Sequence, residues 1–231
     1  AVTPETHDTL LSLEQLKVEL RFWKLLKKEI EIEEISIRNA NVHSGDFFDG
    51  MGINGHLGEL FLESHGVIFS PETARINEFS VKNTDIELTL EAMEDNDTTA
   101  SEPVYWKILL DKIELKNVGF ALKMPQDSLF LRTQLSDAQL KDGVVDLKEA
   151  SYFVDRFRIN QGELAYGAQE DISLQDIGIQ IDSVYCCGRD IRASIHEFVF
   201  KERSGLELLK TEGRIRADQD LIQIPHFMMK T

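Results

Sequence analysis

A glycine-rich segment has the spacing of a nucleotide-binding loop. Residues 50–55 spell G-x-G-x-x-G, the pattern that lets a backbone approach the pyrophosphate of a dinucleotide. That chemistry requires the loop to open a helix, because the helix N-terminus supplies the free N–H groups that bind phosphate. Here the segment follows a polar loop, contains the hairpin-forming pair Asn54-Gly55 and leads into a strand pattern over 57–67. We therefore interpret it as a turn.

The histidines and cysteines lack the spacing of a metal site. None of the six histidines forms an H-x-H or H-x-x-x-H pair. His56 and His65 flank one predicted strand, but no cysteine or carboxylate cluster completes a ligand set. Cys186 and Cys187 are adjacent, a spacing that rarely forms a disulfide. We expect surface histidines, a structural cysteine pair, and neither a metal nor a cofactor.

Carboxylates are abundant, but their spacing is typical of a solvated surface. Four glutamates alternate with isoleucines, which places most of their side chains on the solvent side of a strand. They are Glu29, Glu31, Glu33 and Glu34. The acidic residues 94–97 could contact calcium, but no glycine lies where an EF-hand loop turns. No G-x-S-x-G elbow occurs either, so we expect no enzyme. A glycan-cleaving enzyme, the remaining catalytic alternative, would need two carboxylates about 5–10 Å apart.

The overall charge excludes some partners. The 231 residues carry a formal net charge of −16, with a sequence pI of about 4.8. Such a field repels nucleic acid and anionic membranes, so we expect no nucleic-acid partner. Five prolines and few low-complexity stretches disfavour a disordered chain. No run of 18 apolar residues predicts a membrane-spanning helix in these residues, and no signal peptide opens the chain.

One segment departs from this acidity. Five cations are interleaved with aromatic and leucine residues between positions 17 and 28: Lys17, Arg21, Lys24, Lys27 and Lys28. The pattern over 22–28 predicts a short amphipathic helix. That helix could rest on anionic lipid headgroups, or it could pack one face on a sheet. Residues 13–20 fit either a helix or a strand.

A polar residue recurs along the chain inside a fixed frame of alternating apolar residues. The aligned positions are Asn39, Asn83, Asn117, Asp142, Gln161 and Asp176. Period-2 alternation is typical of a strand with one apolar face. Since the same frame returns at each aligned position, the sequence predicts a repeated β unit.

The alternation slips twice in each unit. The first slip, seen at 33–34 and 77–78, has the residue count of a β-bulge. The second falls on the aligned Asn or Asp, residue types that tolerate a left-handed backbone. Strands bent twice in the same sense predict a curved sheet with one apolar side. The alternative is that this side is the covered core face of a sandwich.

The sequence therefore predicts an all-β fold. We expect an elongated, curved, repetitive antiparallel sheet, forming a U-shaped trough, with the short helix near 22–28. The chain reads as a single repetitive β domain over 1–231, with an exposed acidic loop at 94–103. Both ends of the sequence read as internal to a longer protein, so we expect a fragment.

Three segments resemble one family. Residues 13–42 show a strand, a basic-aromatic turn and the signature I-x-I-x-N-[P/A]-x-V, here at 35–42. Together with 106–125 and 204–225, they resemble the AsmA-like superfamily, and specifically the amino-terminal periplasmic region of TamB-like translocation and assembly module proteins of Bacteroidetes-type bacteria. The one departure in the signature is Ala40, where proline is frequent.

The resemblance implies a location and a function. TamB-like proteins are anchored to the inner membrane by a helix that would precede this segment, and they extend through the periplasm as an apolar trough. They are implicated in carrying phospholipid to the outer membrane. The alternative that the family offers is a scaffold that assists assembly or secretion of outer-membrane β-barrel proteins. The implied partners are thus phospholipid or another acyl-chain lipid, the inner membrane, and a β-barrel protein.

If the apolar slots of the repeat line such a trough, they identify the lipid-contacting residues. The predicted lining is Ile30, Ile32, Ile35, Ile37, Val42, Phe79, Val81, Ile86, Leu88, Ile113, Leu115, Phe120, Leu122, Phe157, Ile159 and Leu164.

Overall fold

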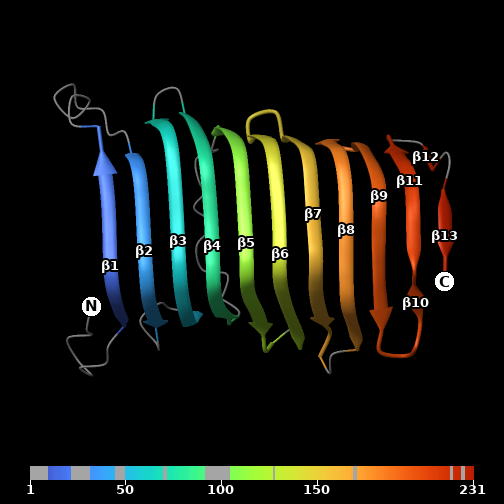
Figure 1. Cartoon of the computed structure of the whole chain (residues 1–231), viewed down its shortest axis with the longest axis horizontal. Helices are drawn as coiled ribbons and strands as arrows, with labels where there is room; N and C mark the ends of the chain where they lie inside the picture. The colour runs from blue at the N-terminus through green and yellow to red at the C-terminus, as the bar shows by residue number, and fades with distance from the viewer. Residues whose placement is uncertain are drawn as a thin grey trace.

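The computed structural model describes most of the chain. The described residues are 10–21, 32–44, 50–69, 72–91, 105–126, 128–168, 171–218, 221–224 and 227–231. Within them the fold is entirely β, and all thirteen strands belong to one open, curled sheet (Figure 1). The predicted helix over 22–28 and the predicted loop over 94–103 lie outside the described residues.

Nine long strands make up most of the sheet. They are β1 (Leu11–Leu20), β2 (Ile32–His43), β3 (Met51–Phe69), β4 (Glu72–Leu90), β5 (Lys107–Met124), β6 (Leu129–Asp146), β7 (Ser151–Tyr166), β8 (Ile172–Cys187) and β9 (Asp190–Glu202). Shorter strands follow: β10 (Glu207–Leu208), β11 (Lys210–Ala217), β12 (Ile222–Gln223) and β13 (Met228–Lys230). Residues 13–20, which fitted either a helix or a strand, are part of β1.

The strands lie side by side almost in sequence order. The order runs from β1 to β9 and then to β11 and β12, while β10 pairs with β9 and β13 pairs with β11. Among the described strands every pairing is antiparallel except that of β4 with β5, which run parallel, with Phe79 opposite Ile113. The chain therefore returns from the end of β4 to the start of β5 before the sheet continues. The predicted antiparallel arrangement is confirmed elsewhere and wrong at this pair.

Asn and Asp residues bend the strands where the repeat predicts. Five of the six aligned positions have a left-handed backbone: Asn39, Asn83, Asn117, Asp142 and Asp176, with φ between 48° and 52°. The short side chains of Asn and Asp tolerate this region because they can hydrogen-bond locally. The sixth position is different. Gln161 is not among the residues with positive φ, and β7 instead shifts its register against β8 between Ile159 and Gly162.

The predicted bulges are also present. Opposite β1, the register shifts where Glu19 faces Glu34 and Leu20 faces Ile32, so Glu33 is the extra residue. Opposite β3, Glu63 faces Glu78 and Ser64 faces Ile76, so one extra residue, Asn77, lies in β4. An extra residue in one strand keeps the apolar row on one side of the sheet while it bends the strand.

The predicted hairpin at Asn54-Gly55 is wrong. Gly50 is a turn residue with φ of 68°, but β3 already begins at Met51 and includes both residues. A Cβ atom at Gly55 would lie 2.2 Å from the backbone oxygen of Asp85 on β4. Glycine is required there because two strands approach closely, and not because the chain turns.

The described strands form no sandwich. One sheet contains all of them, so no second sheet covers either face, and no large side chain among the described residues is less than 2% exposed. The most buried apolar residues are small or central, such as Ala40 and Ala138 at 3% and Val81 at 8%. Packing therefore comes from neighbours within the layer.

The left-handed positions can be tested at Asp142, which is exposed on β6. We expect Asp142→Val to lower the free energy of unfolding by about 1–2 kcal/mol, because a β-branched side chain clashes with its own backbone at this φ. Asp142→Gly should cost less, since glycine has no Cβ. Urea unfolding measures both.

The matched control for this test is Lys141→Val, at the adjacent exposed residue of the same strand. Its φ is not positive, so the change should stay within about 0.5 kcal/mol. Equal losses for the two valine variants would contradict the assigned role of Asp142.

Candidate functional site

Apolar side chains form continuous rows across the sheet. In the first row each residue lies directly opposite the next, from β1 to β9: Leu16, Ile37, Leu60, Val81, Leu115, Ala138, Ile159, Ile179 and Phe198. Cross-strand neighbours of this kind have Cβ atoms about 4.5–5.5 Å apart, so their side chains touch. The row is therefore an unbroken apolar line perpendicular to the strands.

A second complete row runs beside the first. Its members, again from β1 to β9, are Val18, Ile35, Leu62, Phe79, Ile113, Leu140, Phe157, Ile181 and Ile195. Within each strand the members of the two rows are two residues apart, except in β9, where Ile195 and Phe198 are three apart beside a register shift between β8 and β9. Period-2 spacing keeps both rows on one face, which we call the apolar face.

Beyond the Asn bends, shorter rows extend the apolar face. One contains Val42, Gly55, Ile86, Phe120, Thr133, Leu164 and Leu174, so glycine and threonine interrupt it. Another contains Ile53, Leu88, Leu122, Leu131, Tyr166 and Ile172. In β2, β4 and β5 these residues follow the slip at Asn39, Asn83 or Asn117, which restores the apolar residues to the same side.

The structure brings nearly all predicted lining residues into these rows. Ile35, Ile37, Phe79, Val81, Ile113, Leu115, Phe157 and Ile159 belong to the two complete rows, and Val42, Ile86, Leu88, Phe120, Leu122 and Leu164 to the shorter ones. Ile32 lies at the end of β2, opposite Leu20. Ile30 lies outside the described residues.

Several row members were missing from that prediction. β1 and β3 contribute Leu16, Val18, Leu60 and Leu62, although neither strand carries an aligned Asn. Apolar alternation at 16–20 and 57–63 is the sequence pattern that could have identified them. It is weaker than the repeat frame, because in β3 Gly58 and Phe61 interrupt the alternation of apolar and polar residues. Strand order, which places β1 and β3 on either side of β2, was needed to join them to the rows.

Among the described residues, nothing covers the apolar face. Apart from Val81 and Ala138, the members of the two complete rows are half-buried or exposed, and at the edge strand Leu16 is 55% exposed and Val18 48%. No described segment lies over them as a second layer. Roughly 25 cal/mol is gained for each Å² of apolar surface removed from water, so this face has a strong tendency to bind apolar groups.

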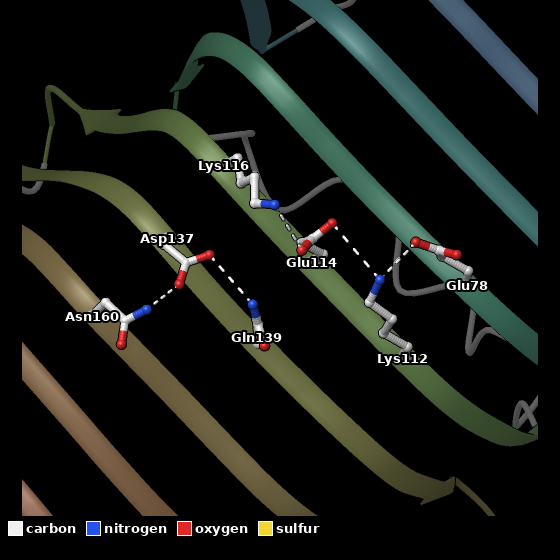
Figure 2. A network of polar contacts seen from close by, with 7 residues as sticks. All are labelled: Glu78, Lys112, Glu114, Lys116, Asp137, Gln139 and Asn160. Carbon is white, nitrogen blue, oxygen red and sulfur yellow. Dashed lines mark hydrogen bonds and ion pairs between the residues drawn. The ribbon is translucent and has the colours of Figure 1, made fainter.

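The opposite face is polar and internally paired (Figure 2). Lys112 on β5 lies 2.9 Å from Glu78 on β4, and Lys116 lies 3.0 Å from Glu114. Successive side chains in a strand point to opposite faces, so Ile113 and Leu115 lie on the far side from these charges. The neighbouring strands continue the pattern, where Gln139 and Asn160 both donate to Asp137.

This network shifts the ionisation of its members. The hydrogen bond from Lys116 lowers the pKa of the Glu114 carboxyl, and the nearby charge of Lys112 lowers it further. The hydrogen bond to Glu78 raises the pKa of the Lys112 ammonium. Both directions favour the charged forms at neutral pH. The Lys112–Glu78 pair helps to hold β5 in register with β4, whereas the Lys116–Glu114 pair lies within β5.

The residues that could do other chemistry are dispersed over the polar face. His43, His56 and His65 each contact a cross-strand asparagine side chain, at Asn54, Asn41 and Asn77. Among the described residues no three His, Cys, Asp or Glu side chains are grouped as a metal site.

The predicted solvent-facing carboxylates and the cysteines have simple surroundings. Glu34 forms an ion pair with Lys17 on β1, and Glu33 forms one with Arg21, the residue that follows β1. Glu29, Glu31, residues 94–97 and the basic residues Lys24, Lys27 and Lys28 lie outside the described residues. Cys186 and Cys187 are free thiols, both half-buried, next to each other in β8.

Comparison with known proteins adds no relative. The chain matches no protein-family model, and no curated protein matches it. Within the described residues, no helix is long and apolar enough to cross a membrane.

The polar network can be tested through Glu114. Because the folded pKa of this carboxyl is lowered, its stabilisation is present above the ordinary pKa and is lost as the pH falls through the folded value. We expect Glu114→Gln to cost about 0.5–1 kcal/mol at pH 7 and progressively less below the usual carboxyl range. Urea unfolding at pH 7 and pH 3 measures the difference.

Glu197→Gln is the control, since Glu197 is exposed on β9 and forms no ion pair with described residues. Its effect should be small at both pH values. A Glu114→Gln deficit of the same size at pH 7 and pH 3 would show that the ion pair is not its origin.

Proposed function

We propose that this chain is part of a TamB-like lipid-transport protein and that its apolar face binds acyl chains. The observation that carries the proposal is the pair of unbroken apolar rows from β1 to β9, which no described second layer covers. The resemblance of residues 13–42 to the AsmA-like superfamily supports the same assignment. In this proposal the apolar face lines the inside of the curl, as a U-shaped trough.

The dimensions suit a conduit better than a single binding pocket. Nine strands at a spacing of about 4.8 Å give a row of roughly 38 Å. The hydrocarbon core of a bilayer is about 30 Å thick and holds two acyl chains end to end. Each row is therefore more than twice the length of one acyl chain, and it runs along the stacking direction of the strands, so further strands would lengthen it.

The energetics explain why such a surface is needed. A lipid leaving a bilayer exposes its tails at a cost of about 0.8 kcal/mol per methylene, or about 12 kcal/mol for a chain of roughly 15 carbons. A continuous row lets a tail exchange one apolar neighbour for the next while its headgroup stays in water. No step then exposes the whole chain, and no catalytic group is required. We infer a periplasmic location and inner-membrane anchoring from the resemblance alone.

A second candidate function is a scaffold for β-barrel assembly, and the edge of β1 favours it. No described strand pairs with the outer side of β1, and the strand contains no proline. Leu16 and Val18 are exposed on it. Such an edge can add a strand from another protein through backbone hydrogen bonds. In that case the partner would be an outer-membrane β-barrel protein and lipid would not be retained.

Adjacent residues on opposite faces give a matched test. We expect Ile37→Asp to weaken binding of a fluorescent acyl-chain phospholipid by about tenfold or more, because a bound tail would bury an unpaired carboxylate. Ser36→Asp adds the same charge on the polar face, opposite Lys17, and should leave binding unchanged. Thermal unfolding of both variants establishes that each is folded.

Lipid extraction and native mass spectrometry of the purified chain provide the direct observation. Copurified acyl lipid that is lost in Ile37→Asp and kept in Ser36→Asp supports the conduit. A wild-type chain that neither copurifies with lipid nor binds the fluorescent phospholipid would contradict it and leave the scaffold as the better candidate.

A further inference from the structure

A basic hollow lies on the polar face at the C-terminal side of the sheet. It has a volume of about 480 Å³ and lies over β8, β9 and β11. Its polar lining consists of Ser183, Tyr185, Asp190, Arg192, Ser194, Arg214 and Arg216. Sites for small ligands typically enclose about 300–1,000 Å³, so the hollow can hold one small organic ion.

Three arginines meet there because of strand pairing. Arg216 lies directly opposite Arg192, and Arg214 lies opposite Ser194. Arg214 and Arg216 are two residues apart in β11, which places both side chains on the same face about 6.6 Å apart along the strand. Like charges that are directly opposite each other destabilise a sheet unless an anion lies between them.

Only one of these arginines is neutralised within the described residues. Arg192 makes two hydrogen bonds to Asp190, at 3.0 and 2.6 Å, and its guanidinium lies 5.8 Å from the ring centroid of Tyr185. Arg214 and Arg216 are exposed and form no ion pair with described residues. On a chain with a net charge of −16, Arg214 and Arg216, with no ion pair to the described residues, form a local positive site.

We propose that this hollow binds a phosphate group carried by a small molecule or a lipid headgroup. Guanidinium groups bind phosphate oxygens through paired, charge-assisted hydrogen bonds, and Arg214 and Arg216 supply two such groups. The hydroxyls of Ser194 and Tyr185 line the same hollow and can donate to further oxygens. Arg192 is neutralised by Asp190, which lines the same hollow, so the positive charge for the phosphate comes from Arg214 and Arg216.

The surroundings limit the ligand to a single phosphate. A second hollow of about 570 Å³ adjoins the first and shares Ser183, Ser194 and Arg214 with it. It also contains Asp182, which is paired with Arg156 and His196, and Glu212, which is paired with Lys210, so it adds no arginine beyond Arg214 for a second anionic group. A polyanion such as nucleic acid does not fit this alternation of charge. The site lies on the face opposite the apolar rows, so it goes beyond the lipid-tail function and is independent of it.

Glycerol phosphate is the probe for the site. We expect the wild-type chain to bind it in calorimetric titration, and the double variant Arg214→Gln/Arg216→Gln to lose at least tenfold in affinity. The control is Arg38→Gln/Arg158→Gln, which removes two exposed polar-face arginines without ion pairs to described residues and changes the net charge equally. It should bind like the wild type.

Two results would overturn the proposal. One is the absence of glycerol phosphate binding by the wild-type chain together with no binding to vesicles of phosphatidylcholine containing phosphatidic acid. The other is an equal loss of affinity in the two double variants, which would attribute the effect to overall charge.

Binding to free glycerol phosphate alone identifies a soluble ligand, whereas a preference for the phosphatidic acid vesicles identifies a lipid headgroup. Ile37→Asp should leave phosphate binding unchanged, which separates this site from the apolar face.

Discussion

A single layer of sheet cannot cover its own apolar face, and this constraint governs the described structure. Every strand gains its contacts from the strands on either side of it, and none from a facing layer. As a result even central residues such as Val81 keep 8% of their surface exposed, and most row members keep more. Stability therefore comes from backbone ladders and cross-strand pairs, while the apolar face keeps its tendency to bind other apolar groups.

Register connects the two faces. A slip of one residue would move every side chain of a strand to the other side of the sheet. The polar pairs oppose such a slip, because Lys112 can reach Glu78 only when Ile113 lies opposite Phe79. The charges on the polar face thus help to keep the apolar rows continuous, although none of these charged side chains belongs to a row. The two faces have different roles but depend on the same pairing.

The bends have an equally local origin. Left-handed residues such as Asn83 and Asn117 are neighbours across β4 and β5, where the side chain of Asn117 donates to that of Asn83 at 3.1 Å. Each bend shifts the alternation by one residue, so apolar residues on both sides of it, such as Val81 and Ile86, fall on the same face. Because the bends at Asn39, Asn83 and Asn117 line up between strands, the sheet curls there instead of single strands kinking.

The sequence by itself determined the all-β class of the fold and the apolar alternation of its strands. It also determined the bulges at 33–34 and 77–78 and five of the six left-handed positions. All of these features depend on the types of residues that lie close together in the chain. It did not determine which strands are neighbours. The parallel pair β4–β5, the close approach at Gly55 that was mistaken for a turn, and the meeting of Arg192 with Arg216 all arise from pairing between strands. Only the tertiary structure decided these, since pairing is set by the sum of many contacts between distant segments and not by any local pattern.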